Sequence, residues 1–274
     1  IGPLTRTVKD TALLLEVIAG HDWRDSTSAE KSSYLPDLDR GIYGMKIGIP
    51  KEYFGEGVNE KVEKSVWDAI SVLEGLGASW QEVSLPHTQY ALAAYYVIAM
   101  SEASSNLARF DGLRYGLRQA GEDRDWHTTF SEIRSKGFGP EVKRRILLGT
   151  YALSAGYYGR YYLKALKVRT LIKEDFLQAF KQVDLLASPT MPIPAFRIGE
   201  RINDPLSLYK ADIFTVPINL AGVPAISLPC GFAGQLPIGL QLIGPHFGEA
   251  AVLQAAQAFE AATPYHERTP EEVV

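Results

Sequence analysis

The sequence predicts an α/β fold with a helical stretch in its middle. Short apolar segments near both ends of the chain have the length and composition of buried strands, and the first two of them flank an amphipathic helix. Residues 87–181 show mostly helical patterns instead. A strand–helix–strand order favours a parallel pair of strands. We therefore expect one domain with a single sheet, built from both ends of the chain, and a mainly helical excursion at about 87–181.

Capping signals and apolar periodicity define the elements of the first part of the chain. Thr7 can cap a helix that continues through the apolar run ending at Ile18, and Gly20 fits the position just past its end. Asn59 can cap a second helix, whose apolar residues fall on one face. The predicted order is helix 7–18, loop 21–43, strand 45–50, helix 59–77 and strand 79–85.

The remaining elements follow from the same patterns. No helix is assigned to the charged, glycine-interrupted stretch 111–139, and GFAG at 231–234 is interpreted as a tight turn between two strands. The predicted elements are one long helix or two at 90–110, helices 140–155 and 159–181, strands 183–189, 225–229 and 238–244, and a final helix 249–262.

Composition excludes several classes of protein. The net charge of −4 argues against a broad basic face for nucleic acid, and no apolar run has membrane-spanning length, so we expect no membrane association. Cys230 is the only cysteine, which rules out an internal disulfide and favours a reducing compartment. We expect a cytoplasmic protein, with an organellar location left open because a targeting segment could precede Ile1.

Common catalytic and cofactor motifs are missing from the sequence. The histidines are scattered with no metal-ligand spacing, so we expect no metal site in this chain. The chain has no phosphate-binding loop and no serine in a GxSxG turn. Cys230 is expected to be a buried, inert thiol, because no adjacent His or Lys would generate a thiolate.

Two charged residues stand next to apolar segments and could bind a small zwitterion. Arg145 precedes an apolar helical run, and Asp212 precedes another. An aspartate can bind the α-ammonium of a free amino acid while an arginine grips its α-carboxylate with two hydrogen bonds. The residues alone leave a plainer interpretation open, in which Asp212 is a helix N-cap and Arg145 belongs to a solvated basic face.

Several segments resemble the amidase-signature family, and together they span nearly the whole chain. Two segments are similar in particular to the A subunits of glutamyl-tRNA(Gln) amidotransferases, a branch of that family, namely SEASSNLARFDG and KRRILLGTYALS within 100–158. The first and last matching segments, IGPLTRTVKDTALLLEVIAGHDWRDSTS (1–28) and LPIGLQLIG (236–244), are found across the family. The matching segments also include KIGIPKEYF (46–54), VRTLIKEDF (168–176), DLLASPTMP (184–192) and DIFTVPINLAGVPAISLPCG (212–231).

The resemblance implies an α/β/α fold around a large mixed sheet, of which this chain would be the C-terminal portion. It implies hydrolysis of glutamine by a serine, a second serine with a cis peptide and a lysine. We expect this group upstream of Ile1, so no catalytic residue is assigned in this chain and the chain alone is expected to be inactive. The released ammonia would pass to the partner B and C subunits, which convert glutamyl-tRNA to glutaminyl-tRNA. The tRNA, ATP and Mg²⁺ are expected mainly in the partner, with no cofactor in this chain.

Substrate-binding residues can be transferred from the resemblance one position at a time. The arginine of KRRI matches Arg145, the aspartate that opens DIFTVP matches Asp212, and a tyrosine before MSEASSNL matches Tyr96, with Tyr95 adjacent. The resemblance thus implies that these three side chains hold glutamine. Two rival interpretations are a stand-alone amidase of the same fold and a non-catalytic interaction fragment.

Overall fold

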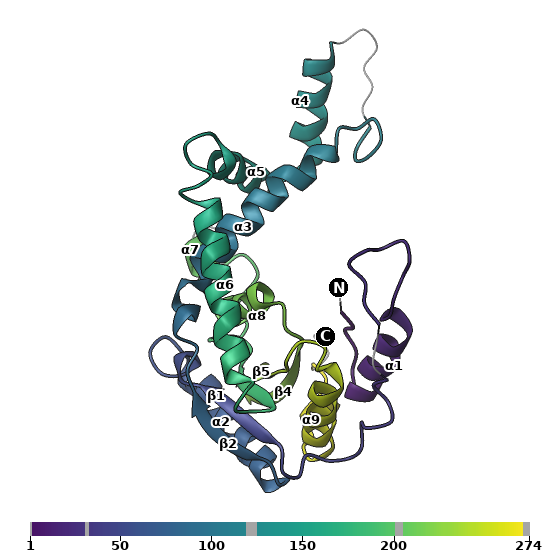
Figure 1. Ribbon diagram of the computed structural model, residues 1–274, viewed down its shortest axis with the longest axis vertical. Coiled ribbons are helices and arrows are strands. Elements are labelled where there is room, and N and C mark those ends of the chain that lie inside the picture. Colours follow the sequence, from purple (N-terminus) through teal and green to yellow (C-terminus); the bar gives the residue numbers. More distant parts are fainter. Residues whose placement is uncertain (1, 31–32, 119–124, 201–204, 271–274) are drawn as a thin grey trace. The chain divides into compact units, whose positions relative to one another are not determined.

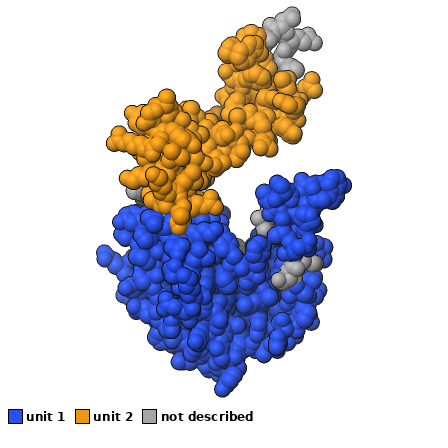
Figure 2. All heavy atoms as spheres, in the orientation of Figure 1, with its two compact units in different colours: residues 1–92, 171–274 blue, residues 93–170 orange. Residues whose placement is uncertain are grey.

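The computed structural model describes residues 2–30, 33–118, 125–200 and 205–270 of the chain (Figure 1). Internal contacts divide the chain into two compact units (Figure 2). Residues 1–92 and 171–274 form the first, called the sheet unit below, and residues 93–170 form the second, called the helical unit. Two helices, α3 (Ala91–Asn106) and α6 (Tyr162–Ala179), contribute residues to both units.

The sheet unit is built on a mixed sheet of five described strands. Their order is β2-β1-β3-β5-β4, in which β1 lies parallel to β2 and β3, while β5 lies antiparallel to β3 and β4. The predicted parallel pair of the first two strands and the predicted α/β fold class are confirmed. The strands are β1 (Lys46–Pro50), β2 (Ser79–Val83), β3 (Leu185–Pro189), β4 (Ala225–Ala233) and β5 (Leu236–Ile243).

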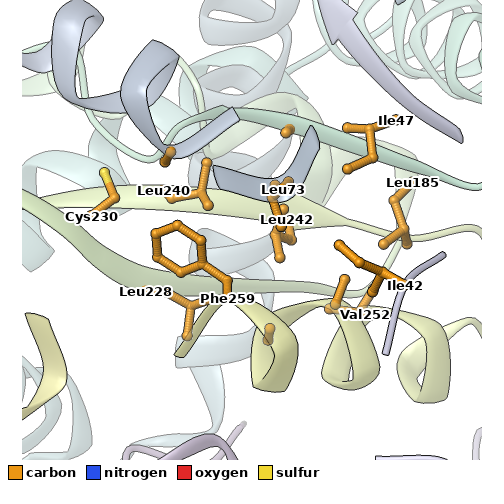
Figure 3. Packing of buried hydrophobic residues seen from close by; sticks show 14 of the residues in the cluster. Ile42, Ile47, Leu73, Leu185, Leu228, Cys230, Leu240, Leu242, Val252 and Phe259 are labelled. Atoms are coloured by element: carbon orange, nitrogen blue, oxygen red, sulfur yellow. The ribbon is translucent and has the colours of Figure 1, made fainter. Parts of the chain in front are cut away.

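Two helices cover one face of this sheet and bury its main core. Leu73 of α2 (Glu60–Gly75) and Phe259 of α9 (Glu249–Ala261) are almost fully buried, and both belong to one cluster with strand residues such as Leu240 (Figure 3). Helix α1 (Val8–Ile18) packs on α9 and adds Val8 to the cluster. Short elements complete the unit: α7 (Pro205–Lys210), α8 (Val216–Ala221), and the 3-10 helices Lys51–Tyr53, Pro86–Tyr90 and Tyr265–Glu267.

The predicted caps of the first two helices are confirmed. The Thr7 side chain accepts a hydrogen bond from the Asp10 backbone N–H (3.1 Å), and the Asn59 side chain accepts one from the Lys61 N–H (3.0 Å). Each bond satisfies one of the N–H groups that the first helical turn leaves without a partner.

The helical unit contains α4 (Trp126–Gly137) and α5 (Pro140–Leu153) besides its parts of α3 and α6, and the 3-10 helix Leu107–Arg109 follows α3. Helix α4 lies in the stretch for which no helix was predicted. Its start is set by Asp125, whose carboxylate accepts hydrogen bonds from the Thr128 N–H (3.0 Å) and hydroxyl (2.6 Å). The charges and glycines of this stretch concealed a capped helix with one buried apolar residue, Ile133.

Two further predictions are wrong in detail. Only the last residue of GFAG belongs to the turn between the last two strands, because β4 continues through Ala233 with a register shift between Pro229 and Gly231. The turn falls instead at Gly234, whose φ of 69° favours glycine. The short helix α7 was also not predicted.

Candidate substrate-recognition site

Arg145 lies on α5 and is held by a carboxylate one turn earlier on the same helix. Its Nε donates a hydrogen bond to Glu141 Oε1 (2.9 Å), while the other oxygen of Glu141 accepts from Arg144 (2.7 Å). The Arg145 side chain is about one third exposed (35%), less than that of Arg144 (49%). Glu141 was not among the predicted site residues, although its spacing four residues before Arg145 is a recognisable signal for a helical ion pair.

The structure brings Arg145 and Tyr96 together inside the helical unit. The Arg145 guanidinium carbon lies 6.0 Å from the centroid of the Tyr96 ring, which is also in edge contact with the ring of Tyr95 at 5.2 Å. A cation over an aromatic ring is attracted by the ring's negative face. The same helix pair therefore carries two of the three predicted substrate contacts.

A close approach of two helices sets this pairing. Gly149 of α5 is buried against the backbone of Met100 in α3, and a Cβ atom at this position would lie 2.6 Å from the Met100 carbonyl carbon. The Ser104 and Thr150 hydroxyls of the two helices form a hydrogen bond of 2.8 Å at the same contact. Arg145 and Tyr96 each stand one turn before this contact, so the absence of a side chain at Gly149 allows them to meet.

Asp212 belongs to the sheet unit and stands just before α8. Its backbone carbonyl accepts hydrogen bonds from the N–H groups of Thr215 (3.1 Å) and Val216 (3.0 Å). The N-cap position of α8 is Thr215, so the interpretation of Asp212 as the cap of this helix is wrong. The half-buried Asp212 therefore lies in the turn that leads into α8. The pairing of Asp212 with Arg145 around one ligand stays a prediction.

A buried polar pair supports the segment that follows Asp212. Gln241 of β5 is 4% exposed, and its Nε2 donates to Ser188 Oγ (3.2 Å) and to the backbone carbonyl of Phe214 (3.3 Å). The Phe214 ring stacks on Tyr53 with centroids 4.9 Å apart. A glutamine inside an apolar strand was the available sequence signal, and it did not enter the prediction.

Segments from distant parts of the sequence line one cavity in the sheet unit. The cavity has a volume of about 890 Å³, and its wall includes Arg6 near the start of the chain, Thr190 after β3, Ser227 of β4 and Gly239 of β5. The Thr190 and Ser227 hydroxyls form a hydrogen bond of 2.7 Å at its edge. Each of these residues lies in one of the segments that resemble the family.

The remaining candidate groups behave as structural elements. Burial raises the pKa of the Cys230 thiol to about 12, with Asp68 as a second cause, and the predicted burial of this cysteine is confirmed. Within the described ranges, no cluster of three or more His, Cys, Asp and Glu side chains could hold a metal ion. None of the helices that the structure describes is long and apolar enough to cross a membrane.

Comparisons with known proteins assign the chain to a family. The sequence model of the family described as Amidase matches residues 1–253, so the chain belongs to the amidase family. Within this family the chain is 63% identical, over all 274 residues, to the A subunit of the Methanosarcina mazei glutamyl-tRNA(Gln) amidotransferase and spans 57% of that protein's length. It is 59% identical over 272 residues to the protein of the same name from Halalkalibacterium halodurans, covering 98% of this chain and 56% of the relative.

Solved structures give the same result for the fold. The crystal structure of the A subunit of the Thermotoga maritima glutamyl-tRNA(Gln) amidotransferase aligns with a TM-score of 0.76 at 42% identity, covering 96% of this chain and 53% of that one. A bacterial aryl acylamidase of the amidase-signature family aligns with a TM-score of 0.75 at 24% identity over 97% of this chain and 53% of that one, which shows the fold alone. The predicted resemblance is confirmed, and the chain spans little more than half the length of these relatives.

Proposed function

We propose that this chain is part of the glutamine-hydrolysing A subunit of an amidotransferase that converts glutamyl-tRNA(Gln) to glutaminyl-tRNA(Gln). Identity of 63% over the whole chain to a protein of that name supports this assignment. The segments 100–116 and 143–158 also support it, because the resemblance links them to this branch of the family rather than to amidases in general.

The chain's own contribution is the recognition of free glutamine. Asp212 binds the α-ammonium, Arg145 binds the α-carboxylate, and the Tyr96 ring lies beside the guanidinium. The observation that carries this proposal is the position of Arg145, fixed by Glu141 through Nε and placed 6.0 Å from the Tyr96 ring. A guanidinium held along its Nε edge is oriented before the ligand binds, which reduces the entropy lost on binding.

The hydrolytic step belongs to groups that the resemblance places before the first matched segment. A serine attacks the side-chain amide of glutamine, a lysine acts through a second serine to move the serine's proton to the leaving nitrogen, and ammonia leaves. Water then hydrolyses the resulting acyl-enzyme to glutamate and the free serine. The B and C subunits would receive the ammonia, and the partner would supply the ATP, the Mg²⁺ and most of the tRNA contact. A cytoplasmic location fits the single buried cysteine.

The test is an Asp212→Asn substitution in the intact enzyme that carries this chain. The change keeps the shape and removes the charge, so loss of a charged hydrogen bond should cost about 1.5–3 kcal/mol in kcat/KM for glutamine, or roughly 10- to 150-fold. Hydrolysis of propionamide, which has no α-ammonium, should keep its rate. Asp10→Asn, at an exposed carboxylate on α1, is the matched control and should leave both reactions unchanged.

Equal losses for glutamine and propionamide would show that Asp212 acts on the fold and not on the ligand's charge. Hydrolysis of simple amides at full rate by the enzyme without any partner would favour the stand-alone amidase. The first result would reject the role of Asp212 in binding the ligand's charge, and the second would favour the rival amidase.

A further inference from the structure

The helical unit concentrates positive charge that the net charge of the chain conceals. Residues 93–170 contain 13 Lys and Arg against 7 Asp and Glu, a net charge of +6. The rest of the chain contains 15 against 25, a net charge of −10. Charge of one sign gathered on one compact unit attracts a partner of the opposite sign.

An open hollow on this unit combines cations with aromatic rings. It has a volume of about 500 Å³ and is formed by α4 and the first half of α5. The rings of Trp126, Phe130 and Phe138 line it together with His127, Arg134 and Lys143. No Asp or Glu is among its described lining residues.

The aromatic wall presents a flat exposed ring. Trp126 is 63% exposed at the first position of α4, and its ring stacks on His127 with centroids 3.5 Å apart. Phe130 meets the Trp126 ring edge-on at 5.8 Å. A large ring that stays this exposed beside other rings has a free surface on which a planar group can stack.

The cations of the hollow keep their charge uncompensated within the described residues. Arg134 donates to the neutral carbonyls of Leu107 (3.0 Å) and Phe110 (3.4 Å), and its guanidinium lies 5.0 Å from the centroid of the Phe138 ring. Among the residues that the structure describes, no carboxylate lies within ion-pair distance of Lys143 or Arg134. Acidic residues pair instead with cations outside the hollow, such as Glu141 with Arg144.

This combination fits an unpaired nucleotide. Proteins bind single-stranded RNA by stacking bases on aromatic side chains while Lys and Arg neutralise the phosphates. A protein partner would also use exposed aromatic residues, but a wall without carboxylates and a unit with a charge of +6 favour a polyanion. We propose that the hollow between α4 and α5 binds an unpaired nucleotide of an RNA, with its base against Trp126 and its phosphates facing Lys143 and Arg134.

RNA binding at this hollow does not depend on how glutamine is bound. It draws on the proposed function only in the choice of tRNA as the natural RNA, and it adds a contact that the proposed function leaves to the partner. A failure of one proposal therefore does not produce a failure of the other in the measurements below.

Fluorescence anisotropy of a labelled single-stranded RNA octamer with the intact enzyme that carries this chain tests the proposal. Trp126→Ala should weaken binding about five- to hundred-fold, the range for loss of one stacked base, while Trp126→Phe should keep most of the affinity. Lys143→Gln should reduce the slope of log affinity against log salt concentration by about 0.7, as for one phosphate contact of a single strand. Circular dichroism of each variant checks that the helices remain.

The matched control is Trp23→Ala in the sheet unit. Trp23 is 79% exposed and carries the Arg24 guanidinium 4.7 Å from its ring centroid, so it has similar chemistry outside the hollow. The proposal is overturned if Trp23→Ala weakens binding as much as Trp126→Ala, or if Trp126→Ala binds the octamer like the unchanged chain. Loss of binding to the partner protein with unchanged RNA binding would identify a protein interface and would also overturn it.

A second measurement in the same intact enzyme uses the natural RNA substrate. In the intact enzyme, Trp126→Ala should raise KM for glutamyl-tRNA at least fivefold, in line with loss of one stacked base, and leave KM for glutamine unchanged. An unchanged KM for the tRNA substrate would count against the hollow as an RNA site, whatever the outcome for glutamine.

Discussion

Replacing Gly149 with alanine tests how the helical unit holds Arg145 beside Tyr96. A Cβ atom at position 149 would lie 2.6 Å from the Met100 carbonyl carbon and 2.7 Å from Ser104 Cβ, where ordinary contact begins at about 3.4 Å. Both obstacles are fixed to the backbone of α3, so the two helices must move apart. The Ser104–Thr150 hydrogen bond would then be stretched beyond its present 2.8 Å.

The expected magnitude follows from three contributions. Alanine is favoured over glycine in a helix by about 1 kcal/mol. Overpacking that moves backbone costs about 1–3 kcal/mol, and loss of the hydroxyl pair costs about 1 kcal/mol. Gly149→Ala should therefore destabilise the protein by about 1–3 kcal/mol, measured by urea unfolding of the helical circular dichroism signal.

A second helical glycine, Gly75, serves as the control for the gain in helix propensity when glycine is replaced by alanine. Gly75 is the last residue of α2, and a Cβ there would meet nothing within 4 Å, so Gly75→Ala should be neutral or stabilising by up to about 1 kcal/mol. Because Arg145 and Tyr96 lie one turn from the contact, Gly149→Ala should also raise KM for glutamine in the intact enzyme. A Gly149→Ala protein at least as stable as the unchanged one would refute the packing argument.

Three more predictions concern single groups and the sheet edges. Burial raises the pKa of the Cys230 thiol from 9.0 to about 12, so the thiol of the unfolded chain ionises first as the pH rises. The free energy of unfolding should therefore fall by about 1.4 kcal/mol per pH unit between pH 9 and 12. In urea titrations, Cys230→Ala should lack this part of the pH dependence. Glu141→Gln should raise KM for glutamine less than about tenfold with kcat unchanged, because the Arg145 guanidinium loses its ion pair with the Glu141 carboxylate but keeps its own charge. A lower kcat at the same KM would contradict a positioning role for Glu141. The isolated chain should release no ammonia from glutamine. It should also self-associate through its edge strands β2 and β4. A monodisperse monomer in light scattering that unfolds cooperatively would contradict this self-association.

The elements that could be predicted from the sequence are those whose signals are local. Thr7 and Asn59 predict the starts of their helices because a cap is made within three residues, and both caps are present. Helix α4 was missed although Asp125 caps it in the same way, because glycines and charges around it masked a single buried residue. The extension of β4 past Pro229 was missed because it depends on pairing with β5 and not on β4's own pattern.

The candidate site likewise contains residues that could be predicted from the sequence and a contact that could not. Arg145 and Asp212 were found as charged residues beside apolar runs, which is a property of the sequence. The meeting of Arg145 with Tyr96 depends on the approach of α5 to α3 at Gly149, and no local pattern contains that distance. The alternative interpretation of Asp212 as a helix cap is wrong, because the turn before α8 places the N-cap three residues later, at Thr215.

The amide of Gln241 also restricts how the sheet can align. Gln241 stands opposite Ser188 on one side and Ser227 on the other, while its neighbours Leu240 and Leu242 face the apolar core. A slip of β5 by one residue would invert every side chain and place the amide in hydrocarbon, with its donors unsatisfied at a cost of several kcal/mol. One polar residue thus makes misaligned sheets unfavourable. The part of the cavity wall at Gly239 can therefore form in only one strand register.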